Sequence, residues 1–219
     1  MIGMDIESFS YYVNDILSSA NPEYYKEEPE KSISKLVKHL QFIPKYASLN
    51  EFKDIKDEFL EQFLYASDYT KLLKLIDRTT IKYEHPNRYT PLMAIVCNQN
   101  ICNFEKKMVL NRLREMNVGI NSSNINGDTA LSMAVRRDDT YMMRYLLENG
   151  ASPNTCDRAG ITPIMIATFN LQLYHIAILY YYGADLTSTC AIFDLDVYDI
   201  AKITNFPAVI ELVHSLKRS

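Results

Sequence analysis

The side chains best suited to chemistry are four cysteines and four histidines, and their spacing matches no metal-binding pattern. Cys97 and Cys102 are the only cysteines close together in sequence, and no pair of histidines completes a zinc spacing beside them. We expect all four cysteines to be reduced residues of the core or of loops, in preference to metal ligands or disulfide partners. The four are Cys97, Cys102, Cys156 and Cys190.

The histidines favour structural roles over catalysis. His175 lies in an apolar stretch, where a buried histidine is the expected interpretation. Neither His39 nor His214 has a nucleophile or a ligand partner in reach, and Glu211 one turn before His214 indicates an ordinary helix-surface pair. No phosphate-binding, dinucleotide-binding, zinc-protease or nucleophile-elbow motif is present. We predict that the protein is not an enzyme and uses no cofactor, metal ion or small-molecule substrate.

Composition and charge exclude several classes of partner. The chain has 219 residues, 47% hydrophobic and 23% charged, which is ordinary for a globular protein. Its net charge is −4, and no basic stripe suggests nucleic-acid binding. The most apolar run, residues 176–184, is far shorter than the roughly 20 residues of a membrane span. The N-terminus lacks the features of a signal peptide, so we expect a cytoplasmic protein, with the nucleus as an alternative.

An internal repeat gives the strongest structural signal. Residues 126–134 (NGDTALSMA) recur as residues 159–167 (AGITPIMIA), 33 positions later. Residues 149–154 (NGASPN) recur as residues 182–187 (YGADLT), again 33 positions later. Two independent landmarks with one period predict a repeat architecture.

The residue types within each repeat suit a pair of helices. Thr129 and Thr162 stand where a hydroxyl can close the turn that starts the first helix. Pro163 follows at the first helical position, where a missing N–H is tolerated. Gly150 and Gly183 supply the left-handed residue that ends the second helix.

An earlier copy begins at residues 89–94 (YTPLMA) and departs from the others. Arg88 replaces the turn glycine, and Asn117 replaces the glycine that ends the second helix. Thr90 to Asn117 spans 27 residues, whereas Thr129 to Gly150 spans 21, so six residues are inserted. We expect them to form a loop between the two helices, near residues 98–104.

The repeat resembles the ankyrin family, whose pattern is G-x-T-P-L-H-x-A followed by a second helix and G-A-D. The resemblance implies an all-α solenoid of stacked antiparallel helix pairs with a helical N-terminal cap. His85 then occupies the position of the family's usual Asp, which implies a turn-stabilising role. We expect a cap segment at residues 1–54 and an ankyrin domain at residues 55–219. The domain divides into a degenerate copy at 55–84, repeats at 85–123, 124–156 and 157–189, and a C-terminal cap at 190–219.

Residues 1–50 do not follow the period. Residues 6–18 and 31–42 are predicted to be helical, and Ile33, Leu36 and Leu40 share one helix face. We expect this segment to pack on the first repeat, and an independent functional element is the alternative.

The resemblance also implies a protein-binding face made of first helices and the loops that precede them. We expect Tyr89 to project from a loop tip. Arg136 and Arg137 form either a solvated turn or a site for acidic groups of a partner. The predicted contact residues are Asn87, Arg88, Tyr89, Ile125, Asn126, Asp128, Arg136, Arg137, Arg158, Phe169 and Asn170. On the first helices, Met93, Ser132 and Met165 would add to them.

The amino-acid composition of the repeats is rich in Ile, Asn, Lys and Tyr. In this respect the repeats resemble ankyrin proteins of poxviruses and other large DNA viruses, as well as those of intracellular bacterial effectors. This resemblance implies a protein that occupies a host signalling protein, such as one of the NF-κB route of innate immunity. The first alternative is an adaptor that uses residues 1–50 as a second docking element, and the remote alternative is an enzyme.

Overall fold

The chain folds into helices throughout the part that the structure describes. The structure is a computed structural model that describes residues 58–78, 88–190 and 194–217. Within these residues it contains ten helices and no strand, apart from one isolated bridge between Ser123 and Thr129. The helices are α3 (Glu58–Tyr65), α4 (Tyr69–Arg78), α5 (Pro91–Cys97), α6 (Asn103–Glu115), α7 (Ala130–Arg136), α8 (Thr140–Glu148), α9 (Pro163–Phe169), α10 (Leu173–Tyr181), α11 (Val197–Thr204) and α12 (Pro207–Lys217). The predicted all-α repeat fold is confirmed. The predicted N-terminal cap, His85 and Asn87 lie outside the described residues.

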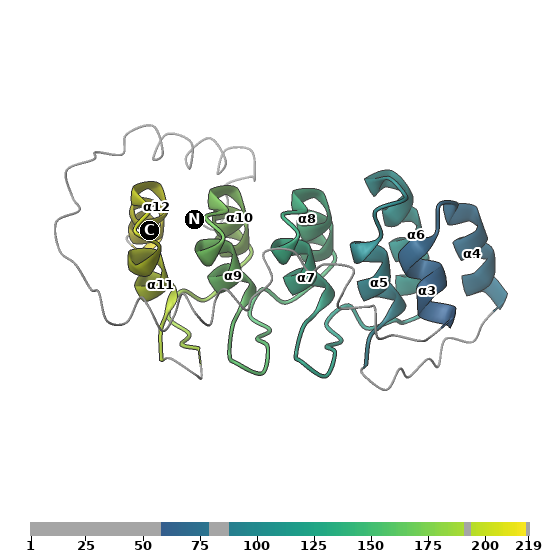
Figure 1. Cartoon of the computed structure of the whole chain (residues 1–219), viewed down its shortest axis with the longest axis horizontal. Helices are drawn as coiled ribbons and strands as arrows, with labels where there is room; N and C mark the ends of the chain where they lie inside the picture. The colour runs from purple at the N-terminus through teal and green to yellow at the C-terminus, as the bar shows by residue number, and fades with distance from the viewer. Residues whose placement is uncertain (1–57, 79–87, 191–193, 218–219) are drawn as a thin grey trace. The chain divides into compact units, whose positions relative to one another are not determined.

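The described helices form two compact units, one ending at Asp157 and the other beginning at Arg158. In the first unit, α5 packs between α3 and α7 in one row, and α6 packs between α4 and α8 in a second row (Figure 1). In the second unit, α9 packs on α11 and α10 packs on α12 (Figure 1). Each unit therefore has two layers, one of first helices and one of second helices, as the 33-residue period requires.

Side-chain caps start α5, α7 and α11, but not α9. The Thr90 hydroxyl accepts a hydrogen bond from the Met93 N–H at 3.2 Å, and Thr129 caps the Ser132 N–H at the same distance. The prediction that Thr162 closes its turn in this way is wrong, because its hydroxyl is buried without a hydrogen-bond partner. Helix α9 still begins there, since Pro163 at its first position fixes a helical φ and has no N–H to satisfy.

Left-handed residues recur at the predicted helix ends. Asn117, Gly150 and Gly183 have φ values of 60°, 90° and 88°, which confirms that asparagine replaces glycine in the earliest of these three copies. The turn before the first helix is equally regular: Arg88 adopts φ 58° where Gly127 and Gly160 stand in the later copies.

The six inserted residues do not form a simple loop. The linker between α5 and α6 has five residues, against three between α7 and α8, and α6 has 13 residues against nine in α8. Two of the extra residues thus lie in the linker and four lengthen the second helix, so the loop prediction is wrong in part. The reason is a helix start at Cys102, where the N–H is bonded to the Glu105 carboxylate at 2.8 Å.

Hydrogen bonds hold the linker between α5 and α6 to the end of α3, and the first turn of α6 to α5. The fully buried Asn98 donates from Nδ2 to the carbonyl oxygens of Phe63 at 2.8 Å and Ala66 at 3.0 Å. Its Oδ1 accepts from the N–H of Asn100 at 2.7 Å. In the first turn of α6, the buried Lys106 points Nζ at the Val96 carbonyl oxygen, 3.3 Å away.

Apolar packing between the layers holds each unit together. Phe63 on α3 and Ile76 on α4 are fully buried, so these two helices contribute to the apolar core of their unit. Leu146 on α8 is also fully buried. In the other unit His175 is 1% exposed, as expected for a core histidine, and the Tyr180 hydroxyl donates to the Leu216 carbonyl oxygen at 2.9 Å.

Candidate protein-binding surface

The loop that precedes α7 is held by the side chain of Asn124. Its Oδ1 accepts from the N–H groups of Asn126 and Asp128, both at 2.9 Å, and its own N–H donates to the Asp128 carbonyl oxygen at 2.9 Å. Gly127 completes the turn with φ 87°. The turn leaves Asn126 exposed at its tip on a backbone with few alternative conformations.

A buried ionic cluster joins this loop to α7. Arg136, in the last turn of α7, forms an ion pair through Nη1 with the Asp128 carboxylate. Its Nη2 lies 3.5 Å from Oδ2 of Asp157, in the following loop. The side chains of Arg136 and Asp128 are only 7% and 8% exposed, against 16% for Asp157. The cluster therefore fixes how two successive loops sit on one helix.

The structure corrects the predictions for three residues, two of which belong to this cluster. Arg136 neither lies in a solvated turn nor offers its charge to a partner's acidic groups, because acidic groups of its own chain neutralise it. The Asp128 carboxylate is likewise paired within its own chain, with the Arg136 guanidinium. Tyr89, expected at a loop tip, is buried at 6% exposure.

A signal in the repeat could have revealed this pairing. In the next copy, 33 residues on, the positions of Asp128 and Arg136 hold Ile161 and Phe169. The charged pair of one repeat thus corresponds to an apolar pair in the next. When both positions change together from charged to apolar between two repeats, the two side chains are expected to contact each other within each repeat.

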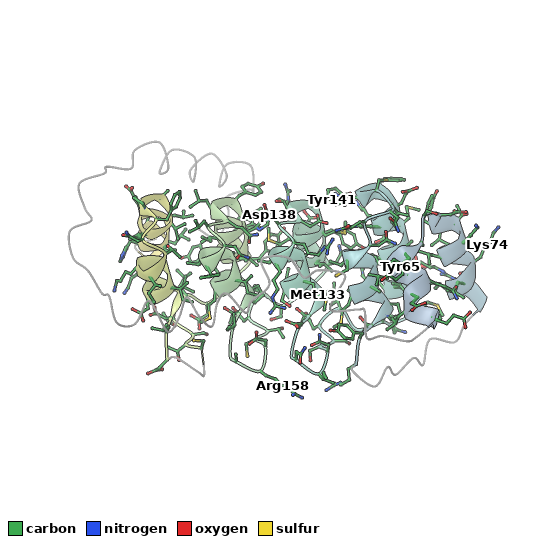
Figure 2. All side chains as sticks on the ribbon, viewed as in Figure 1. Tyr65, Lys74, Met133, Asp138, Tyr141 and Arg158 are labelled. Carbon is green, nitrogen blue, oxygen red and sulfur yellow. The ribbon has the colours of Figure 1, made fainter. Side chains whose placement is uncertain are left out.

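The remaining candidates are accessible to different degrees. In the unit that ends at Asp157, Arg88 and Asn126 are exposed, and Ile125 and Arg137 are half-buried. In the unit that begins at Arg158, that residue is exposed at the tip of its loop (Figure 2).

The other candidates in this second unit lie at the end of α9. Phe169, the last residue of α9, and Asn170, which follows it, are half-buried. The Oδ1 atom of Asn170 is buried without a hydrogen-bond partner.

Helices α5, α7 and α9 offer little surface. Met93, Ser132 and Met165, which the sequence placed among the contact residues, are 0%, 5% and 1% exposed. Among the candidate residues, the exposed side chains Arg88, Asn126 and Arg158 all lie on loops.

Comparison with protein families finds a match for part of the chain. Residues 101–190 match the family model of ankyrin repeats in three copies. The matched segment contains the loops before α7 and α9 and the ionic cluster. Ankyrin repeats are protein–protein interaction modules, which agrees with a binding surface made of loop residues.

The described residues carry few groups with reactive chemistry. None of the four cysteines forms a disulfide; Cys97 and Cys190 are buried, and Cys102 and Cys156 are exposed. Burial lowers the pKa of Lys106 below its ordinary value of 10.5, and the nearby Asp139 carboxylate opposes that shift. Because Lys106 is enclosed by its own repeat, it is a structural group. Across the described ranges, no helix is long and apolar enough to cross a membrane.

Proposed function

We propose that this protein binds another protein through the loops that precede its first helices. Two exposed side chains, Asn126 and Arg158, carry the proposal, because each stands at the tip of a loop in its own unit. Arginine is among the residues that dominate binding hot spots. A loop held by the Asn124 hydrogen bonds loses little conformational entropy when a partner binds, which favours affinity.

We further propose that the partner is a host signalling protein, of the innate-immunity or NF-κB type, and that the protein inhibits it by occupying it. This proposal is supported by the amino-acid composition of the repeats, which resembles that of ankyrin proteins of large DNA viruses and of intracellular bacterial effectors. The proposed mode of action is non-covalent, with no enzymatic step and no cofactor, in the cytoplasm of the host cell. A partner with acidic groups would complement Arg88 and Arg158.

Affinity purification from host cells followed by mass spectrometry tests this proposal. The full chain should capture a host protein that the variants Asn126→Ala and Arg158→Ala capture poorly. Lys74→Ala is the matched control, because Lys74 is an exposed cation on α4 and not on a loop. Equal capture by all variants would move the contact surface away from the loops.

The adaptor alternative makes a different prediction. If residues 1–50 are a second docking element, their deletion removes one captured protein and leaves another in place. If the protein only blocks one partner, deletion removes no separate protein from the captured set.

A further inference from the structure

Two asparagines of the sequence are followed directly by glycine, and both lie in the unit that ends at Asp157. They are Asn126, at the tip of the loop before α7, and Asn149, which follows the last residue of α8. An asparagine in this setting can react with its own backbone. Glycine has no Cβ to keep its nitrogen away from the preceding side chain, so the two groups can approach each other closely.

The reaction joins the backbone nitrogen of the glycine to Cγ of the asparagine. The nitrogen gives its proton to water, the N–Cγ bond forms, the Cγ–Nδ2 bond breaks, and the amide group leaves as ammonia with a proton taken from water. Water then opens the cyclic imide at either of its carbonyl groups. The product is aspartate or isoaspartate, in which the main chain runs through the side chain. The net reaction consumes water, releases ammonia and adds a carboxylate to the protein.

The side chain of Asn126 is available for this reaction. It is exposed, and no hydrogen bond joins its amide group to any residue that the structure describes. The Gly127 N–H donates to the Asn124 carbonyl oxygen at 3.0 Å, so the attack requires this hydrogen bond of the turn to open. The Oδ1 atom of Asn124 also holds the turn, through the N–H groups of Asn126 and Asp128. We therefore expect Asn126 to react more slowly in the folded protein than in the unfolded chain.

Asn149 has the same neighbour, but its side chain is bound. Its Nδ2 donates to the Tyr145 carbonyl oxygen at 2.6 Å, and its Oδ1 accepts from the Arg114 guanidinium. The Gly150 N–H donates to the Leu147 carbonyl oxygen at 3.1 Å. Ring closure at this position therefore breaks two side-chain hydrogen bonds in addition to the one at the glycine. The contacts that end α8 thus protect the half-buried Asn149.

We propose that Asn126 is a deamidation site, whose side chain is converted to aspartate and isoaspartate in the folded protein while Asn149 stays intact. The reaction uses only water and the protein's own backbone. It replaces a neutral amide by a negative charge at the tip of the loop before α7, so this loop changes as the protein ages. The consequence for partner binding rests on the proposed function, whereas the conversion itself does not.

Peptide mass spectrometry of the full chain, incubated at neutral pH in heavy-oxygen water, tests the proposal. Each converted asparagine acquires a heavy oxygen atom, and fragment ions locate it in the sequence. Asn126 should be converted about 10-fold faster than Asn149 or more, because each further hydrogen bond that must open slows the reaction several-fold. When the chain is unfolded by guanidinium chloride, the two residues should react at similar rates.

Asn154 is the matched control for exposure. It is exposed like Asn126, but it precedes Thr155, whose β-branched side chain hinders the approach of the nitrogen, so it should remain unconverted. The proposal is overturned if the folded chain converts Asn126 no faster than Asn149, or if Asn154 is converted as fast as Asn126. It is also overturned if the difference between Asn126 and Asn149 persists in the unfolded chain, because the fold is then not its cause.

A separate variant distinguishes this proposal from the proposed function. Asn126→Asp carries the charge of one reaction product, and it should capture a partner with acidic groups more weakly than the wild type does. Wild-type capture by this variant would contradict the role of the loop in binding. Equal conversion rates at Asn126 and Asn149 in the folded chain would contradict the deamidation site, whatever the partner.

Discussion

Replacing Arg136 by alanine should destabilise the unit that ends at Asp157 far more than the loss of an ordinary arginine. The substitution leaves the Asp128 carboxylate, only 8% exposed, without its ion-pair partner. Asn124 Nδ2, at 3.4 Å, is too distant to replace a guanidinium. Removing one partner of a buried pair costs about 3–5 kcal/mol of the free energy of unfolding. That corresponds to a fall of more than about 1 M in the urea midpoint of unfolding.

The next repeat suggests how to reverse this loss. Asp128→Ile with Arg136→Phe installs the apolar pair that stands at the equivalent positions Ile161 and Phe169. Because apolar replacement of a buried ion pair is often neutral or stabilising, the double variant should recover most of the lost free energy. Asp157 is more exposed and can be solvated without Arg136.

Urea denaturation followed by circular dichroism measures all of these variants. Arg144→Ala is the control, because Arg144 pairs with Glu148 on an exposed surface and its loss should cost less than about 1 kcal/mol. The reasoning about the cluster is refuted if Arg136→Ala costs no more than Arg144→Ala. It is also refuted if the double variant is less stable than the single one.

Three further perturbations test the packing of the same unit by denaturation. Leu146→Ala should cost about 2–5 kcal/mol by opening a core cavity, and a loss below about 1 kcal/mol would contradict its burial. Asn98→Ala should cost about 2 kcal/mol or more, because it leaves the carbonyl oxygens of Phe63 and Ala66 without their donor. Burial lowers the pKa of Lys106, so between its folded and unfolded pKa values the unfolded chain binds more protons. The free energy of unfolding of the wild type minus that of Lys106→Met should therefore rise as the pH approaches the ordinary lysine pKa of 10.5 from below, and a flat or falling difference would count against a buried ammonium group.

Features that depend on backbone conformation could be predicted from the sequence. Asn117 was identified as a helix end because asparagine tolerates a left-handed conformation better than other side chains do, and its φ of 60° confirms this. Thr129 and Thr162 carry the same helix-start signal, a hydroxyl that can bond a free N–H; Thr129 makes this bond and Thr162 does not. Such signals are local, so one repeat suffices to show them.

Features that depend on which side chains meet could not be predicted in the same way. The pairing of Arg136 with Asp128 joins residues eight positions apart. It becomes apparent only when these two positions are compared together with the two equivalent positions of the next repeat. The structure of the six-residue insertion could be predicted only in part, for a similar reason. Its length follows from the period, but its division between linker and helix depends on the helix start at Cys102 and on the burial of Lys106 beneath it.

The central claim is that loop residues bind another protein, and the affinity of a captured partner tests it most directly. The dissociation constant is measured for the full chain and for Asn126→Ala, Arg158→Ala and the control Lys74→Ala. At least one loop variant should bind about 30-fold more weakly, the loss expected of a hot-spot residue of about 2 kcal/mol, while its thermal midpoint stays unchanged. The Lys74 variant should bind like the wild type. Wild-type affinity in both loop variants would contradict the claim.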